Sequence, residues 1–116
     1  MPERYSEFYS QTEIQDHARA VQRLSPDAPV AIAEFGYEAD RETGIHFTVC
    51  TYDAPGLFSY LTGILGSFRF NIQSGHIFTS SSGIAIDTFR GFLPSEAEID
   101  AWIVSLERTL TEILVP

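Results

Sequence analysis

The chain has 116 residues, 44% of them hydrophobic and 13% aromatic, and 16 acidic against 7 basic residues give a formal net charge of −9. This composition favours one folded globular domain over a disordered chain. The acidic balance, without any run of Lys or Arg, argues against binding to nucleic acid or to an anionic membrane. Neither a long apolar run nor a signal peptide is visible, and Cys50 is the only cysteine, so we expect a cytoplasmic protein without disulfides.

Residues 1–29 are predicted to form a helical extension that ends in a linker. Aromatic residues near the N-terminus predict a segment that docks by its rings or stays mobile. Thr12 and Gln15 have the spacing of a capping box, and apolar residues at steps of three or four then predict a short helix over about 12–24. Two prolines in the stretch 25–29 predict a linker or a stiff turn.

Residues 30–116 are predicted to form the folded domain proper. Alternating patterns rich in β-branched and aromatic residues predict four strands, over 30–38, 45–52, 71–79 and 84–92. The polar stretch 39–44 ends in Gly and is short enough to close a hairpin between the first two strands. A Ser-rich turn at 80–83 closes a second hairpin between the last two strands.

Two helices are predicted to alternate with these strands. The first runs from Leu57 to about Phe68, where apolar residues recur on one helical face. The second follows another capping box, formed by Ser95 and Glu98, and carries a clear apolar stripe along 99–114.

From residue 45 onward the predicted order is β-α-β-β-α, a split βαβ or ferredoxin-like core without its last strand. In that layout the first strand is central and one of its edges is free. The strand 30–38, joined to it by a hairpin, can fill the empty place from the other end of the chain. We therefore expect an α+β fold in which an antiparallel four-stranded sheet carries two helices on one face, with an additional N-terminal helix.

The turn between the strand 45–52 and the next helix is the strongest candidate site. Asp53 is a favoured N-cap, Pro55 is tolerated in a first helical turn, and Gly56 allows a backbone or a ligand to come close. Such a turn directs free N–H groups and the positive end of the helix dipole at one point, where a carboxylate can bind. A well-capped helix start without a ligand explains the same residues.

Several motifs between 45 and about 114 resemble an ACT domain, a small regulatory module that usually binds amino acids and assembles as a dimer. They are the Asp-x-Pro-Gly turn at 53–56, the pair Asn71-Ile72, and the strand Asp87-Thr88-Phe89. The strand 30–38 would then replace the last ACT strand. The residues around 13–17 and 85–89 are most similar to the C-terminal ACT region of bacterial PII uridylyltransferases, which senses glutamine.

The resemblance implies a ligand site shared with a partner chain and formed by Asp53, Ala54, Pro55, Gly56, Leu57, Asn71 and Ile72. Asp53 would pair with the ammonium of an amino acid, while the N–H groups of Gly56 and Leu57 would bind its carboxylate. Asn71 would recognise a side-chain amide. Position 54 is Ala, where the family often has Arg or Lys, and the chain ends at Pro116 without a second ACT repeat.

The remaining reactive side chains predict no further site. His17, His46 and His76 lack the spacing of zinc ligands. Cys50 has no base near it in the sequence, and Asp87 has neither a base nor a second carboxylate near it. We expect no catalytic residue, no metal and no cofactor.

The sheet face away from the two helices is expected to be exposed and to carry His46, Thr48, Tyr52 and His76. A mixed, weakly charged surface of this kind suits association and predicts a homodimer. Trp102, within the last apolar stripe, is expected in the core or in dimer packing.

The sequence thus predicts a non-catalytic regulatory module that binds a small amino acid, with glutamine as the candidate. Such a module would control a nucleotidyltransferase of nitrogen regulation, in the same polypeptide or as a separate partner. The alternative is a ligand-free protein–protein assembly module. A small enzyme is the least supported hypothesis.

Overall fold

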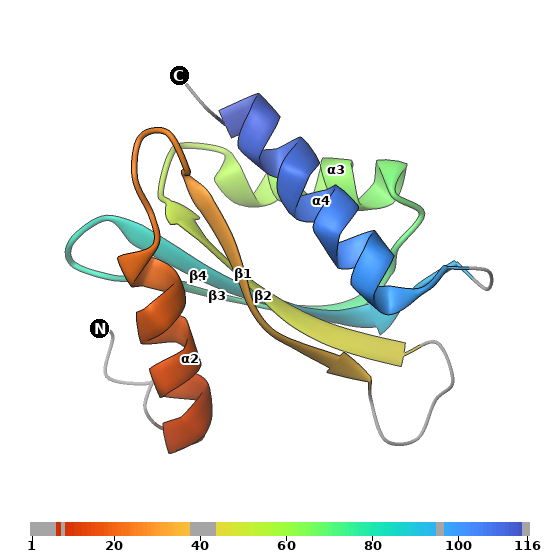
Figure 1. Ribbon diagram of the computed structural model, residues 1–116, viewed down its shortest axis with the longest axis horizontal. Coiled ribbons are helices and arrows are strands. Elements are labelled where there is room, and N and C mark those ends of the chain that lie inside the picture. The colour runs from red at the N-terminus through yellow and green to blue at the C-terminus, as the bar shows by residue number, and fades with distance from the viewer. Residues whose placement is uncertain (1–6, 8, 38–43, 95–96, 115–116) are drawn as a thin grey trace.

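The computed structural model describes residue 7 and the ranges 9–37, 44–94 and 97–114, and it confirms the predicted α+β fold. A four-stranded antiparallel sheet carries α3 and α4 on one face and α2 on the other (Figure 1). The elements in chain order are α2 (Gln11–Gln22), β1 (Val30–Tyr37), β2 (Gly44–Tyr52), α3 (Leu57–Ser67), β3 (Asn71–Thr79), β4 (Ile84–Phe92) and α4 (Ile99–Leu114).

The strand order β1-β2-β4-β3 is that of the ferredoxin-like sheet. The central pair, β2 and β4, is in register from Gly44 opposite Phe92 to Tyr52 opposite Ile84. On the outer side of β2, β1 pairs antiparallel and occupies the place of the missing last strand, as the hairpin argument predicted. Most of the connecting stretch 39–44 lies outside the described residues.

One face of the sheet and the helices α3 and α4 enclose the larger hydrophobic core. Alternate residues of the central strands face these helices, namely Ile45, Phe47 and Val49 of β2 and Ala85 and Phe89 of β4. Trp102 of α4 packs edge-on against Phe47, with ring centroids 5.7 Å apart, and its indole N–H donates to the carbonyl oxygen of Phe68 at 3.3 Å. The predicted core position of Trp102 is confirmed.

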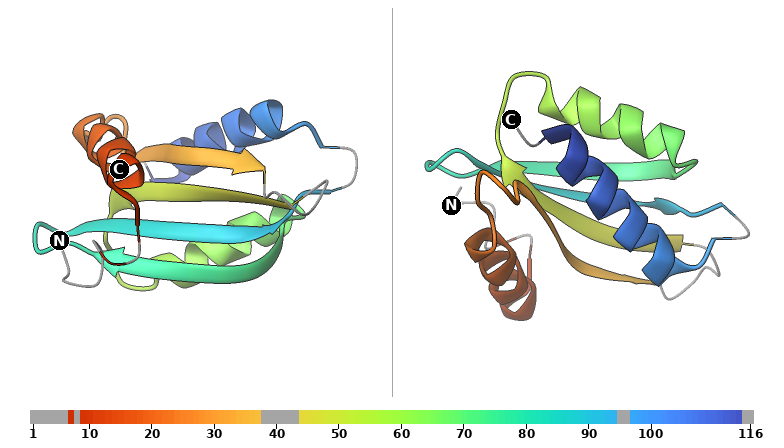
Figure 2. Two further views of the ribbon diagram at one scale, coloured as in Figure 1. Left: turned by 90° about the horizontal axis from the view of Figure 1, so that it is seen from below. Right: turned by 45° about the horizontal axis from the view of Figure 1, so that its top comes forward.

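On the opposite face of the sheet, α2 packs against β1 and β2, and Figure 2 shows it on the side away from α3 and α4. Ala20 of α2 packs in a second apolar cluster with Ala31 of β1, Cys50 of β2 and Ile86 of β4. Cys50 is fully buried there, as a small core residue. The described part of the extension 1–29 therefore shares a core with the sheet.

Tyr9 fixes the start of this segment to the sheet. Its hydroxyl hydrogen-bonds to the hydroxyl of Thr88, which is also 2.7 Å from the hydroxyl of Thr48. Its ring contacts His17 edge-on, with centroids 4.6 Å apart. The prediction that aromatic residues dock this segment is confirmed for Tyr9, while residues 1–6 and 8 lie outside the described part.

The prediction that this face of the sheet is exposed is therefore only partly correct. Thr48 is completely buried, because Tyr9 and α2 cover the centre of that face. His46 and His76 are half-buried, and Tyr52, at the end of β2, is 41% exposed. The association surface predicted from these four residues does not exist as one open patch.

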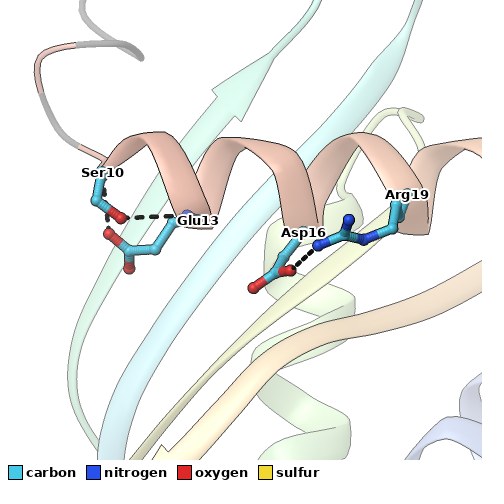
Figure 3. Close-up of polar contacts among 4 residues, drawn as sticks. All are labelled: Ser10, Glu13, Asp16 and Arg19. Atoms are coloured by element: carbon cyan, nitrogen blue, oxygen red, sulfur yellow. Dashed lines mark hydrogen bonds and ion pairs between the residues drawn. The ribbon is translucent and has the colours of Figure 1, made fainter.

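The capping box predicted for α2 differs from the cap that forms. At the start of α2, Ser10 accepts from the N–H of Glu13 at 3.1 Å, and the Glu13 carboxylate accepts from the N–H of Ser10 at 2.9 Å (Figure 3). The box predicted at Thr12 and Gln15 is wrong by two residues, because Ser10 and Glu13 have the same spacing and start the helix earlier. An Asp16–Arg19 ion pair follows on its exposed side.

At the start of α4, Glu98 is itself the capping residue. Its carboxylate accepts from the N–H groups of Asp100 and Ala101, at 3.0 and 2.9 Å. These two bonds favour the ionised form and lower the pKa of Glu98. Ser95, its predicted partner, lies outside the described residues.

Candidate functional site

The turn between β2 and α3 is tied to the neighbouring hairpin at its first residue. The N–H of Asp53 donates to the carbonyl oxygen of Gly83 at 2.8 Å, one step beyond the last pair of β2 and β4. Residues 53–56 are exposed, whereas Leu57 is buried and fixes the first turn of α3 to the core. The turn is therefore an exposed backbone loop held at both of its ends.

Gly56, and not Asp53, is the N-cap of α3. Its φ of 76° lies in the left-handed region that favours glycine, and no side chain caps the helix. The predicted cap at Asp53 is wrong because α3 begins only at Leu57, after an additional turn in which the Leu57 N–H donates to the carbonyl oxygen of Ala54 at 3.1 Å. The carboxylate of Asp53 thus remains available for another partner.

The start of α3 consequently has free hydrogen-bond donors. Within the described residues, no acceptor is bonded to the N–H groups of Gly56, Phe58 and Ser59. The N–H of Leu57, predicted to bind a carboxylate, is already used inside the turn. The unbonded donors and the positive end of the helix dipole favour an anion at this place.

A pocket of about 240 Å³ adjoins the turn. It is lined by Pro26, Pro29, Thr51, Tyr52, Asp53, Ala54 and Leu114. The hydroxyl of Thr51 donates to the carbonyl oxygen of Pro29 at 2.6 Å, which holds the linker against the end of β2. The contribution of the linker and of the end of α4 to this site was not predicted from the sequence, because it depends on packing between distant segments.

A second carboxyl group, that of Asp87, is buried close to the turn. Asp87 of β4 is 1% exposed and faces α3 and α4, on the same side of the strand as Ala85 and Phe89. Its Oδ1 atom has no hydrogen-bond partner among the described residues. Burial, and next the negative charge of Asp53, raise the pKa of Asp87 to about 7. No carboxylate lies near Asp87 in the sequence, because the fold alone brings Asp53 close to it.

Asn71 and Ile72 do not join this group within one chain. Asn71 pairs with Phe92, at the end of the sheet where β2 begins, whereas Asp53 follows the opposite end of β2. The side chain of Asn71 is exposed, and Ile72 packs partly against the core. The turn and Asn71 can form one site only if a second chain contributes one of them.

The arrangement offers groups that can bind a small ligand. One exposed carboxylate, one buried carboxyl and several free N–H groups surround the start of α3, and such groups complement a ligand with one positive and one negative end. No group of three or more metal-binding side chains occurs within 9–37, 44–94 and 97–114. Among the helices that the structure describes, none is long and apolar enough to cross a membrane.

No family model matches the chain, but two curated proteins are similar to most of it. A bifunctional uridylyltransferase/uridylyl-removing enzyme of Aromatoleum aromaticum is 35% identical over 109 residues, which are 91% of this chain and 12% of that protein. The enzyme with the same name from Chromobacterium violaceum is 34% identical over 89 residues, which are 76% of this chain and 10% of that protein.

A solved formyltetrahydrofolate deformylase of Pseudomonas putida is similar to part of the chain, with a TM-score of 0.48 and 19% identity. The match covers 58% of this chain and 24% of the deformylase chain. The predicted similarity to a uridylyltransferase is confirmed by the two curated relatives. The chain spans about a tenth of their length. It is thus similar, over most of its residues, to a small part of a bifunctional uridylyltransferase/uridylyl-removing enzyme.

Proposed function

We propose that this chain is a non-catalytic, ACT-like regulatory module that binds an α-amino acid at the turn 53–59. The observation that carries the proposal is the uncapped start of α3 beside the carboxylate of Asp53. The ligand's carboxylate accepts hydrogen bonds from the N–H groups of Phe58 and Ser59, and its ammonium pairs with Asp53. Hydrogen bonds to charged groups contribute about 1.5–3 kcal/mol each, so a few suffice for a metabolite.

The two edges of the sheet support a homodimer as part of the proposal. At the β1 edge, the N–H of Ile32 is bonded to the carboxylate of Glu107 from α4, at 3.1 Å. The β3 edge, Asn71–Thr79, contains no charged residue and no proline, and its residues are alternately exposed. An edge of this kind pairs readily with another strand. Two-fold antiparallel pairing of β3 with a second copy would bring Asn71 of one chain towards the turn of the other.

The relatives suggest what such a module regulates. Both are named as uridylyltransferase/uridylyl-removing enzymes, and the chain matches only about a tenth of each. We infer that the module adjusts the activity of a nucleotidyltransferase of nitrogen regulation, with glutamine as the first ligand to test. Binding acts by favouring one packing of two modules over another, which requires a different affinity for the two arrangements.

Thermal melting in the presence of each of the twenty amino acids tests the binding. A ligand at 100 times its dissociation constant adds about 2.7 kcal/mol to the free energy of unfolding, which raises the melting temperature by several degrees. A folded protein whose midpoint is unchanged by all twenty would refute amino-acid binding and favour the ligand-free assembly module.

The dimer is tested separately by sedimentation. Ile77 of β3 is 50% exposed, and Ile77→Lys introduces a charge at the proposed dimer edge. Val104 on α4 is 60% exposed and away from that edge, so Val104→Lys is the matched control. We expect monomers only for Ile77→Lys; two variants with the same sedimentation would exclude β3 as the dimer edge.

A further inference from the structure

We propose that Asp87 is a second ligand-binding residue, which holds the ammonium group of the amino acid from the sheet side while Asp53 approaches it from the turn. This inference rests on the proposed function and adds to it a residue from β4 that is distant from the turn in the sequence. It also defines the ligand class more closely, because a carboxylic acid without an amino group leaves Asp87 without a partner.

The position of Asp87 follows from the two contacts that fix the turn to β4. At one end, the N–H of Asp53 donates to the carbonyl oxygen of Gly83 at 2.8 Å. At the other end, the ring of Phe58, in the first turn of α3, is stacked on Phe89 with centroids 5.8 Å apart. Residue 87 lies between these two contacts along the chain and on the same face of β4 as Phe89, because alternate residues of a strand share a face. The turn and the start of α3 therefore lie over the stretch of β4 that carries Asp87.

Among the residues that the structure describes, no cation is paired with Asp87. Its cross-strand neighbours are Val49 of β2 and Ile77 of β3, both apolar. The whole of α3 contains no acidic or basic residue. A carboxyl group without a hydrogen bond or a cation is unfavourable in such a place. An ammonium group beneath the turn would supply the missing charge and the missing hydrogen bonds.

The same site does not suit a bare metal ion. Within the described residues, the N–H groups of Gly56, Phe58 and Ser59 are unbonded donors at the start of α3, and the positive end of the helix dipole repels a cation that carries no negative group. A zwitterion satisfies both halves, because its carboxylate meets the N–H groups while its ammonium meets the two carboxyl groups. This complementarity selects an α-amino acid over both a metal ion and a simple carboxylate.

The test is a thermodynamic cycle measured by isothermal titration calorimetry. The probes are the amino acid with the largest melting shift and the carboxylic acid that lacks only its α-amine, which for glutamine is glutaramate. Each is titrated into the wild type, Asp87→Asn and Asp100→Asn. Asp100 is an exposed residue in the first turn of α4, so Asp100→Asn makes the same change of charge without reaching the site.

We expect Asp87→Asn to weaken binding of the amino acid about 10- to 100-fold and to leave binding of the des-amino acid unchanged. Asp100→Asn should match the wild type with both probes. Equal affinity of Asp87→Asn and wild type for the amino acid would overturn the inference while leaving the proposed function intact. A wild type that binds no amino acid would overturn both, as would Asp87-dependent binding of Mg²⁺ or Ca²⁺ alone.

Discussion

Replacement of Asp87 by Asn should stabilise the protein at high pH and have little effect at low pH. The folded chain retains a proton on Asp87 up to about pH 7, whereas the unfolded chain releases it near the ordinary pKa of 3.8. Between these two values the folded state binds more protons than the unfolded state. The contribution of Asp87 to the free energy of unfolding therefore falls as the pH rises from about 4 to 7, and is constant above that range.

The size of the effect follows from the same two pKa values. One pKa unit corresponds to about 1.36 kcal/mol, so Asp87 can lower the free energy of unfolding by up to about 4 kcal/mol at pH 8. An amide of the same shape has no charge to bury. Asp87→Asn should therefore be more stable than the wild type by a few kcal/mol at pH 8, and nearly equal to it at pH 4.5.

Urea denaturation at a series of pH values measures this difference, with the fluorescence of Trp102 as the probe of the core. Contributions that do not involve Asp87 cancel when the two proteins are compared, so the difference between them reports on Asp87. Asp53→Asn removes the nearby negative charge and should move the wild-type transition to lower pH. A difference between Asp87→Asn and wild type that stays constant from pH 4.5 to 8.5 would refute the reasoning.

Three smaller changes test the local structure by urea denaturation at one pH. Ser10→Ala should lower the free energy of unfolding by about 1 kcal/mol through loss of the α2 cap, whereas Thr12→Ala should lower it much less. The reverse order would contradict the cap at Ser10 and favour the one predicted at Thr12. Gly56→Ala should cost about 1–2 kcal/mol because φ is 76°, while Gly63→Ala, inside α3, should not destabilise; equal effects would contradict the left-handed cap. Tyr9→Phe should cost about 1 kcal/mol through the lost bond to Thr88, and no loss would contradict the docking of the N-terminal segment.

The strands and helices were predictable because their apolar patterns are strong. The predicted bounds of β3 and β4 are those observed, and the helix predicted from Leu57 begins there. The position of β1 also followed from short connections, since a hairpin places a strand beside the preceding one. Local periodicity and connection length are properties of the sequence itself, so no tertiary information was needed.

The N-cap of α3 could not be predicted from local sequence patterns. The residues before Leu57 allow a helix that begins near Asp53 as well as one that begins after Gly56, and the choice depends on how Leu57 packs in the core. The covering of Thr48 depends likewise on where α2 docks. Amphipathicity shows that a helix has a buried face but does not show which surface receives it.

The separation of Asn71 from Asp53 was predictable in principle. An 11-residue helix advances the chain by about 16 Å, so the residue that follows α3 must lie near the far end of the sheet from the turn. The two residues belong to motifs of one resemblance, but these motifs carry no information about the distance between them within one chain. Asp87, by contrast, becomes a neighbour of the turn only through the pairing of β2 with β4, and no local pattern reveals that pairing.

The structural and binding experiments on Asp87 together separate a structural carboxyl from a functional one. If Asp87 only filled the core, Asp87→Asn would gain stability at pH 8 and would have no other effect. If Asp87→Asn gains stability and loses amino-acid affinity, the free energy lost by burying the carboxyl in the empty site is recovered when an ammonium group binds there. Groups with strongly perturbed pKa values are frequent at functional sites for this reason. Under this reasoning the instability of the ligand-free site and its affinity for the amino acid have the same origin, the unpaired carboxyl between Val49 and Ile77.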